Sequence, residues 1–595
     1  MAKPASSRSA RIAGLASDPL AWILLAVLVV HAVGIGWGLP ATDGWDSDGV
    51  APRDFLPGLY RTFTPGSFNT YPPVHLVVLA VLTLPITLAG YLRAPAHDLP
   101  SLVGELVQVP YMTSIAYVAR SASLVMSVAI VYFLARTAEE IATALPGSTP
   151  SASRRAGWCT AAFAGVNATL AYYAKTTNLD VPYLFWATWS LLVFVRAIVR
   201  AEPRLLRRAF VLAALAIGTK DQAYALFALS IPIALGGWAF AESSLSRRGA
   251  ILREAAIGAA VALVVLLVVD NALLNPSGFA GRLAFLRGSA SQDYVEYTND
   301  WPGRWGLLAD AYHRFPRQMP KPLGAFALAA AGWALARARR SRGPAVVAVA
   351  VPLLVLVSFT VAFNFVARRA DARFLLPQAL MLAPYGGLAL APLVFAAGRT
   401  RRLVAQAVAS AGLAGGLFTC IAVAANLHHD PRYDAEAWLR AHVAPGDTVE
   451  VYGKNVYLPR FTEVPDARVQ RVGPEPVAGR NPLPGVTEIE APFEDAPARA
   501  PRFIVVPYAW VWRYLIRPDD FYLGAGRQHA PTQERDAAQG GAVGWFRQLR
   551  DDKGPYRVAH VSDYDGSIFP IVHVHGTTGL PVWIYELRTP TSAGE

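Results

Sequence analysis

Three carboxylates follow the first long apolar segment of the chain, in the stretch "GWDSDGVAPRDF". Asp46, Asp48 and Asp54 could supply a general base, a pair of metal ligands, or only the solvated start of a loop. The residues that follow, "APRDFLPGLYRTF" after Trp45, have the pattern of an amphipathic interfacial helix. This context favours a functional role for the acids over a free loop.

Basic residues stand where other apolar segments end. Lys175 and Asp180 flank one junction, Lys220 lies at another, and Arg368 and Arg373 precede a late segment. Lys175 and Lys220 could also snorkel from span ends. Ionisable groups at membrane depth are costly, so such positions indicate function. Together these residues suit an anionic ligand, because Lys and Arg bind phosphate oxygens and a nearby carboxylate can accept a proton.

The composition identifies the elements that must position these residues. Of 595 residues, 54% are hydrophobic and only 16% are charged, which is typical of a polytopic membrane protein. The net charge of +12 is spread in small Arg clusters between apolar segments, so it indicates membrane topology and not a partner nucleic acid. The two cysteines, Cys159 and Cys420, both lie in apolar stretches and offer no thiolate metal site.

Eleven apolar segments could each cross a membrane as a helix of about 20 residues. They lie near residues 20–38, 113–135, 157–174, 179–197, 208–220, 221–240, 252–273, 322–338, 344–365, 374–397 and 403–426.

The stretch from Val74 to Leu92 is also long enough to span, but Pro85 interrupts it. If it crossed once, the Arg clusters would lie on the side opposite the N-terminus. The positive-inside rule therefore favours a re-entrant element, an interfacial element or a there-and-back pair, and predicts 11 to 13 crossings. This topology places the first-loop acids and the long loop from Asn275 to Pro320 on the outer face.

The tail differs in kind from the rest of the chain. The segment "DAEAWLRAHVAPGDTVEVYG" predicts an amphipathic helix, a turn and a strand, and "RFIVVPY", "YRVAHV" and "VWIYELR" predict further strands. We therefore expect a transmembrane domain over residues 1–426 and a small extracytoplasmic α/β domain over residues 427–595. The tail carries no nucleophile elbow, P-loop or dinucleotide fingerprint, so we expect no catalysis there.

The order of several motifs resembles the GT-C superfamily of integral-membrane glycosyltransferases. The bacterial branch near the protein O-mannosyltransferases and the lipid A aminoarabinose transferases is the most similar part. The resemblance runs from the first span to about Pro459. It rests on "WDSDGVAPRD", the "YPP" that begins at Tyr71, "YVARSASLVMSVAIVYFLAR", "YYAKTTNLDVPYLFWATWSLL", "IGTKDQAYALFAL", "DARFLLPQALMLAPYGGLAL" and "DPRYDAEAWLRAHVAPGDTVEVYG".

The resemblance implies an inverting transfer of a hexose or pentose from a polyprenyl-phosphate donor, on the extracytoplasmic face of a bacterial inner membrane. The acceptor would be a glycan, a lipid or a protein. Family members place a catalytic Asp in the first outer loop, commonly followed by Glu, whereas here Gly49 follows Asp48. Either Asp46 or Asp48 is the base, and Asp48 fits better because it precedes the expected interfacial helix.

The other site residues take roles that follow from their charge. Lys175, Lys220, Arg368 and Arg373 are expected to hold the donor phosphate and offset the charge on the leaving group. Asp180, His75 and Tyr71 are expected to position substrate, although a histidine such as His75 is more commonly a core residue. The donor leaves as a charged phosphate, so no cofactor or metal is required. A divalent cation held by Asp46 and Asp48 is the alternative, because the oligosaccharyltransferases among the relatives bind one through first-loop acids.

Two other classes of function compete with a transferase. A transporter or flippase of a lipid-linked glycan should carry its polar groups near mid-membrane, in broken helices and often in repeated halves. A noncatalytic scaffold would leave the outer-face Lys, Arg and Asp residues without a task. The clustering of these residues at span ends on one side favours the transferase.

Overall fold

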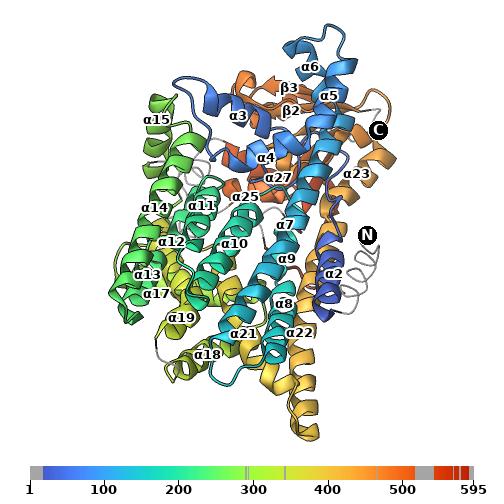
Figure 1. Ribbon diagram of the computed structural model, residues 1–595. Coiled ribbons are helices and arrows are strands. Elements are labelled where there is room, and N and C mark those ends of the chain that lie inside the picture. Colours follow the sequence, from blue (N-terminus) through green and yellow to red (C-terminus); the bar gives the residue numbers. More distant parts are fainter. Residues whose placement is uncertain are drawn as a thin grey trace, which may run out of the picture.

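The chain forms a bundle of helices with a small sheet domain at one end (Figure 1). The computed structural model describes residues 18–288, 291, 294–340, 343–464, 467–515, 542–566, 568–574 and 578–588. The sheet and the short helices of the first loop share the upper end in Figure 1, and the long helices run away from them. A polytopic helical protein with a C-terminal α/β unit, as the sequence predicts, is thus confirmed.

The first half of the bundle contains α2 (Pro19–Ala32), α3 (Phe55–Phe63), α4 (Val74–Leu82), α5 (Leu84–Arg93), α6 (Leu99–Leu106), α7 (Val109–Thr143), α8 (Pro150–Gly165), α9 (Ala168–Tyr173), α10 (Asp180–Val199) and α11 (Leu205–Ile217). The second half contains η1 (Asp221–Ala223), α12 (Tyr224–Phe227), α13 (Ser230–Ala241), α14 (Leu245–Val269), α15 (Pro276–Arg287), α17 (Trp301–Arg314), η2 (Phe315–Arg317), α18 (Lys321–Ala338), α19 (Pro344–Phe359), η3 (Thr360–Asn364), α20 (Phe365–Ala367), η4 (Ala372–Leu375), α21 (Leu376–Val394) and α22 (Arg399–His428).

Seven helical segments among the described residues are long and apolar enough to cross a membrane, or up to eight if one bent pair forms a single span. This number is smaller than the 11 to 13 crossings that the sequence suggests. Four expected crossings correspond to α2, α8, α11 and α18, which do not meet the same test of length and composition. One physical reason is visible at α8, because the apolar run breaks where Asn167 caps the new helix α9 by accepting from Leu170 N.

The bent pair is the stretch from Val74 to Leu92. Helices α4 and α5 meet at an angle of 57°, so this stretch is not one straight span. Pro85 lies in the first turn of α5, where a proline is tolerated because its nitrogen needs no partner there. The break at this point agrees with the positive-inside argument against a single crossing. A helix is also present where the sequence predicts one after the first-loop acids, as α3.

Among its described residues, the expected long loop from Asn275 to Pro320 contains the helices α15 and α17 and the short η2. Each of the two α-helices begins with a side chain that caps it: Asn275 accepts from Gly278 N, and Asp300 accepts from Gly303 N. Each cap is followed by a proline in the first turn, which is a strong helix start. A search for apolar runs misses these helices because their composition is mixed.

Small residues let the central helices approach closely. Gly387 on α21 faces α8, and a Cβ at this position would overlap Thr160 Oγ1. Packing of this kind is typical of membrane helices, where close backbone contact replaces the hydrophobic drive for association. Helices α7, α8, α10 and α21 pack together as the centre of the bundle.

The C-terminal domain is a six-stranded sheet with the order β3-β2-β1-β4-β6-β5. Its strands are β1 (Thr448–Val451), β2 (Arg468–Gly473), β3 (Val486–Glu490), β4 (Phe503–Pro507), β5 (Tyr556–Ser562) and β6 (Val582–Leu587). Its helices are α23 (Pro431–His442), η5 (Asn455–Tyr457), η6 (Phe461–Glu463), η7 (Val477–Gly479), η8 (Phe493–Asp495), α24 (Ala496–Arg499), α25 (Tyr508–Leu515) and α27 (Ala542–Arg550). The pairs β1–β2, β1–β4 and β2–β3 are parallel, whereas β4–β6 and β5–β6 are antiparallel.

Both faces of this sheet are covered. Phe503 and Val505 of β4 pack with Leu439 of α23 on one face. Ile504 and Val506 of the same strand belong to the cluster on the other face, which α25 and α27 cover. The near-continuous apolar run of β4 follows from this burial on both sides.

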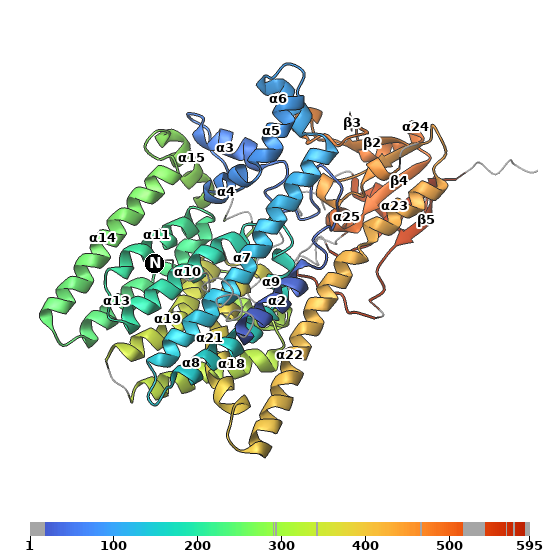
Figure 2. The same cartoon turned by 45° about the vertical axis from the view of Figure 1, so that its right-hand side comes forward.

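The sheet domain also contacts the bundle through side-chain packing and hydrogen bonds. The segment between β5 and β6 leaves the sheet, and its Val574 is buried in the main core of the bundle. Asn426 near the end of α22 holds this segment, since it donates to Pro570 O at 3.3 Å and accepts from Val572 N at 2.7 Å. Helix α22 runs along the bundle toward the sheet domain in both views (Figures 1 and 2).

Candidate active site

Asp48, the predicted base, is in direct contact with Arg373, which is predicted to bind the donor phosphate. Arg373, in η4 just before α21, forms an ion pair with the Asp48 carboxylate. The Nε of the same guanidinium lies 3.5 Å from Asp371 Oδ2. The Asp48 side chain remains 28% exposed, whereas that of Arg373 is 14% exposed. A carboxylate that solvent can reach is therefore paired with a largely buried cation at the end of the bundle that carries the first loop.

Asp46 is buried and shapes the turn that presents Asp48. Its Oδ1 accepts from the Asp48 backbone N–H at 3.1 Å, which is an Asx turn. Its Oδ2 is buried and has no hydrogen-bond partner among the described residues. Buried carboxylate oxygens are normally hydrogen-bonded, so this oxygen is able to accept a bond from a bound hydroxyl.

Gly49 stands where the resemblance leads one to expect Glu, and the local packing explains the difference. A Cβ at Gly49 would lie 2.7 Å from Thr177 Oγ1 and 3.2 Å from Asp46 O. Thr177 holds the loop here: its hydroxyl donates to Ala51 O at 2.9 Å, and its carbonyl accepts from Val50 N at 3.2 Å. A side chain at position 49 would push the acid-bearing turn away from the segment before α10.

A second ion pair lies below the first-loop acids. Lys220 Nζ lies 2.8 Å from Asp180 Oδ1, and Gln222 Nε2 donates to the same oxygen at 3.1 Å. Asp180 is fully buried and Lys220 is 8% exposed. The Oδ2 of Asp180 has no hydrogen-bond partner among the residues that the structure describes. Two residues predicted from separate junctions are thus joined.

Tyr71 lies between these two groups of charges. Burial, together with the nearby carboxylates of Asp180 and Asp46, raises the pKa of its hydroxyl to about 12, against the opposing effect of Arg369. The phenol therefore stays protonated and is a hydrogen-bond donor at any physiological pH. This position between the acids agrees with a role in orienting a bound substrate.

The neighbouring residues Arg369 and Arg368 line two different cavities. Arg369 stacks on Phe374 at 4.9 Å and on Tyr294 at 5.1 Å, and burial lowers its pKa while Asp371 opposes the shift. Together with Asp371 it lines an apolar cavity of about 170 Å³ between α17, η3 and the start of α21. Arg368 instead lines a separate cavity of about 370 Å³ with Arg304.

Lys175 and His75 lie deeper in the protein. Lys175 is fully buried, and its ammonium donates to Val33 O at 2.7 Å, at the start of the first loop. His75 is 1% exposed on α4, and its Nδ1 has no hydrogen-bond partner in the described part of the chain. Lys175 therefore supports the start of the first loop from the protein interior, whereas His75 is a buried side chain of α4.

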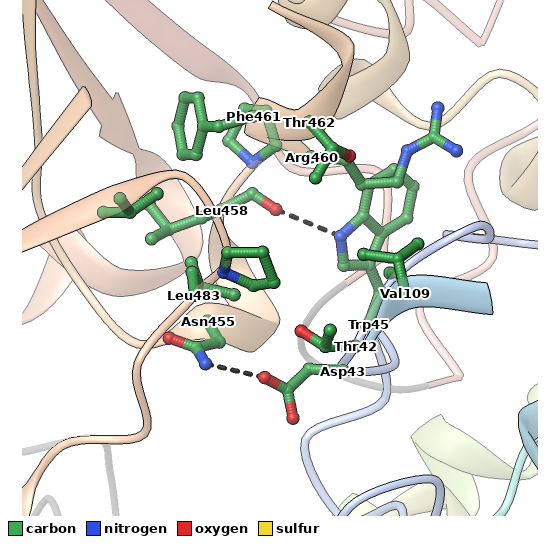
Figure 3. A pocket seen from close by; sticks show the side chains of 14 residues that line it. Thr42, Asp43, Trp45, Val109, Asn455, Leu458, Arg460, Phe461, Thr462 and Leu483 are labelled. Carbon is green, nitrogen blue, oxygen red and sulfur yellow. Dashed lines mark hydrogen bonds between the residues drawn. The ribbon is translucent and has the colours of Figure 1, made fainter. Parts of the chain in front are cut away.

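The sheet domain grips the loop that carries the acids (Figure 3). Trp45, next to Asp46, donates from Nε1 to Leu458 O at 3.0 Å, and the guanidinium of Arg432 stacks on its ring at 4.1 Å. Asn455 donates to Asp43 Oδ2 at 2.7 Å. We call the contacts of Trp45 and Asp43 with Arg432, Asn455 and Leu458 the loop clamp.

Arg120 is a further support that the sequence pattern did not single out. This residue lies within the long apolar helix α7 and is only 3% exposed. Its Nη1 donates to Ile35 O at 2.6 Å and to Trp37 O at 2.7 Å, so it fixes the start of the first loop. An arginine inside an apolar run is itself a signal of function and could have identified this position. Thr177 and Arg432 carry no such signal.

The first-loop acids are poorly suited to hold a divalent cation. Arg373 already contacts Asp48, and a second cation beside it would be repelled. Within the described ranges, no three His, Cys, Asp or Glu side chains come together as metal ligands. We therefore derive no chemical step through a metal ion.

Comparisons with known proteins give matches to solved structures. No family model and no curated protein matches the sequence. The oligosaccharyltransferase AglB from Archaeoglobus fulgidus, in complex with an inhibitory peptide and a dolichol-phosphate, matches with a TM-score of 0.45 and 11% identity, over 96% of this chain and 88% of that chain. ArnT from Cupriavidus metallidurans, bound to undecaprenyl phosphate, matches with a TM-score of 0.44 and 14% identity, over 84% of this chain and 93% of that chain.

Proposed function

We propose that this multi-pass membrane protein is an inverting glycosyltransferase that moves a sugar from a polyprenyl-phosphate donor to an acceptor hydroxyl. The observation that carries the proposal is the Asp48–Arg373 ion pair, which joins a solvent-accessible acid to a cation that can bind a phosphate, at one end of an apolar bundle. The order of the GT-C-like motifs along the sequence supports the same assignment.

In the proposed reaction, Asp48 is the base. It takes the proton of the acceptor hydroxyl while the hydroxyl oxygen attacks the anomeric carbon, and the bond from that carbon to the donor phosphate breaks with its electron pair leaving on the phosphate. Arg373 offsets the charge of the leaving phosphate. Since the phosphate and Asp48 compete for one guanidinium, donor binding draws Arg373 from Asp48 and makes the carboxylate available as a base.

The apolar cavity beside Arg369 suits the donor lipid. It is lined by Leu307, Leu308 and Phe365, and Arg369 and Asp371 stand among its polar lining residues. Isoprene units bury well against such walls, while the guanidinium of Arg369 can hold a phosphate oxygen. We assign the first isoprene units of the donor to this cavity and its phosphate to Arg373 and Arg369.

The remaining predicted residues take supporting roles in this proposal. Lys220 and Asp180 neutralise each other, so they organise the floor of the site, and the unpartnered oxygen of Asp180 can position the acceptor or sugar. Tyr71 donates a hydrogen bond to the sugar or phosphate. Lys175, bonded to Val33 O, supports the loop and adds positive potential.

The cellular setting belongs to the same proposal. We assign the protein to a bacterial inner membrane, with the site and the sheet domain on the extracytoplasmic face and a glycan, lipid or protein as acceptor. No metal is needed for the step, because the leaving group is already a charged phosphate.

The test is transfer of labelled sugar in membranes supplied with a panel of polyprenyl-phosphate hexoses and pentoses. Asp48→Asn should lower turnover at least about a hundredfold, since general bases contribute factors of this size. Asp54→Asn is the matched control: Asp54 belongs to the same loop but precedes α3, and it should retain most of the activity.

Asp46→Asn separates the two candidate bases. We expect a smaller loss than for Asp48→Asn, because the amide keeps an oxygen that can accept from Asp48 N. A complete loss in Asp46→Asn with retained turnover in Asp48→Asn would transfer the role of base to Asp46. Unchanged turnover in both variants would refute the acid-base assignment altogether.

A further inference from the structure

A third cavity lies at the end of the bundle opposite the first-loop acids. It measures about 140 Å³ and is enclosed by the ends of α7, α8, α18 and α21. These helix ends lie at the bottom of Figure 1, away from the sheet domain. Its apolar walls include Leu145, Leu388 and Pro392, and two arginines, Arg155 and Arg337, line the same space.

The two arginines come from different helices and are oriented by aromatic rings. The guanidinium of Arg155 on α8 lies 4.8 Å from the ring centre of Phe395, and that of Arg337 on α18 lies 5.6 Å from the ring centre of Trp333. Arg337 also donates to Pro146 O at 2.7 Å. Stacking and a single backbone bond leave most of the N–H groups of both guanidiniums available to a ligand.

Neither arginine forms an ion pair with a described carboxylate, unlike three arginines at the same end, Arg196, Arg200 and Arg207. Arg196 and Arg200 both bond to Glu140, at 2.8 and 2.6 Å, and Arg207 bonds to Glu254 at 2.6 Å. The two arginines that line the cavity are therefore not neutralised by a described carboxylate.

We propose that this cavity binds the phosphate headgroup of an anionic membrane lipid. The two guanidiniums would share the phosphate oxygens, and the apolar walls would receive the first carbons of the lipid chains. Charge complementarity decides the occupant: two uncompensated cations beside an apolar cavity, at the level where membrane helices end, match an anionic phospholipid and not a neutral one. The bound lipid would bridge α8 and α18 and so stabilise this end of the bundle. The proposal does not depend on the proposed transferase activity.

The test uses the full-length protein in detergent and in nanodiscs of defined composition. Native mass spectrometry should show that the wild type retains phosphatidylglycerol over phosphatidylcholine. The double variant Arg155→Gln/Arg337→Gln should lose this selectivity by at least about tenfold, since it removes the charge-assisted hydrogen bonds to the phosphate. Phosphatidylglycerol should raise the Tm of the wild type and leave that of the variant unchanged.

The double variant Arg339→Gln/Arg340→Gln is the matched control. Arg339 and Arg340 lie just beyond the end of α18, are exposed and do not line the cavity. The control therefore removes an equal charge and should keep the lipid selectivity. Equal loss in both double variants would reduce the effect to general surface charge and overturn the proposal. Unchanged selectivity in Arg155→Gln/Arg337→Gln would also overturn it.

Two further arms complete the experiment. If the Gln variant does not fold, Arg155→Lys/Arg337→Lys keeps the charge but loses the forked donor geometry, and it should show reduced selectivity for phosphatidylglycerol. Inorganic phosphate added to protein in neutral detergent should not raise the Tm. A rise as large as that with phosphatidylglycerol would mean that a free phosphate occupies the cavity, against the proposal.

Discussion

Arg373 is the residue on which both halves of the proposed chemistry depend, because its guanidinium contacts the candidate base and can contact the leaving phosphate. Arg373→Gln should lower transfer at least about tenfold through loss of charge-assisted bonds. Its effect should be larger on turnover than on the KM for the donor, because the charge on the phosphate grows as the bond breaks. Steady-state kinetics at varied donor concentrations measures the effect on turnover separately from the effect on the KM for the donor.

Arg368→Gln provides the comparison for Arg373→Gln. Arg368 is close in sequence but lines the separate cavity with Arg304. We therefore expect transfer within about threefold of the wild type, as for a surface substitution away from the site. An equal loss in both variants would show that Arg373 acts only as one positive charge among several.

The close packing around Gly49 predicts that a larger residue at this position lowers activity. Gly49→Ala places a methyl group 2.7 Å from Thr177 Oγ1, so the loop must shift and transfer should fall by about tenfold or more. Gly44→Ala in the same loop is the control, because the nearest atom to its Cβ is the end of Arg120 at 3.7 Å. Combined with Thr177→Ala, Gly49→Ala should cause little further loss, since the clash is gone. Additive losses in the double variant would contradict this explanation.

The sequence predicts which residue types gather at the outer end but not how they pair. Asp48, Lys220 and Arg373 stand out because charges at span ends are costly and so need a reason. Their partners depend on helix packing: Lys220 meets Asp180 only because the junctions before α10 and after α11 lie together. Thr177 leaves no trace in the sequence pattern, since a threonine beside an apolar run has no periodicity of its own.

At the scale of elements, the loop clamp makes α23 part of the site although no atom of α23 needs to touch substrate. Arg432 stacks on Trp45, bonds to both oxygens of Asp430, and donates to Val456 O at 2.6 Å. Arg432→Lys keeps the charge but cannot make all these contacts. We expect turnover to fall between about tenfold and a hundredfold, with little change in the KM for the donor, because the acid turn is displaced.

Arg440→Lys on the same helix is the control for the clamp. Arg440 is exposed and bonds to Glu463, away from the first loop. The Arg440→Lys variant should therefore have the same turnover as the wild type. Rescue of the Arg432→Lys effect by raising the donor concentration would show instead that the clamp serves donor binding.

The sheet shows what the sequence can and cannot predict about elements. The segments that became β1, β4, β5 and β6 are predicted by their β-branched and aromatic residues. Strands β2 and β3 are not predicted in this way because charged residues lie inside them: Arg471 is 4% exposed and bonds to Glu488 at 2.8 Å. A buried ion pair across two strands has the sequence pattern of a surface loop.

At the scale of the whole molecule, the proposed orientation can be tested by labelling. The two native cysteines are free and buried, so the wild type should not react with a membrane-impermeant maleimide. Ala96→Cys, exposed in the turn before α6, should label in intact cells, whereas Thr400→Cys at the start of α22 should label only after permeabilisation. The reverse pattern would place the site on the cytoplasmic face. Labelling of both variants in intact cells would contradict the placement of α6 and the start of α22 at opposite ends of the bundle (Figure 1).

The segment between β5 and β6 carries a consequence for biosynthesis. Val574 fills the core of the helical bundle, and Leu458 and Arg432 hold Trp45 beside the acids. The first loop of the nascent chain therefore leaves the ribosome long before the residues that fix it in place. The helices can enter the membrane one after another, but the acid turn gains its final shape only after the end of the chain has been synthesised and has docked. A protein truncated before the sheet would insert normally and still be inactive.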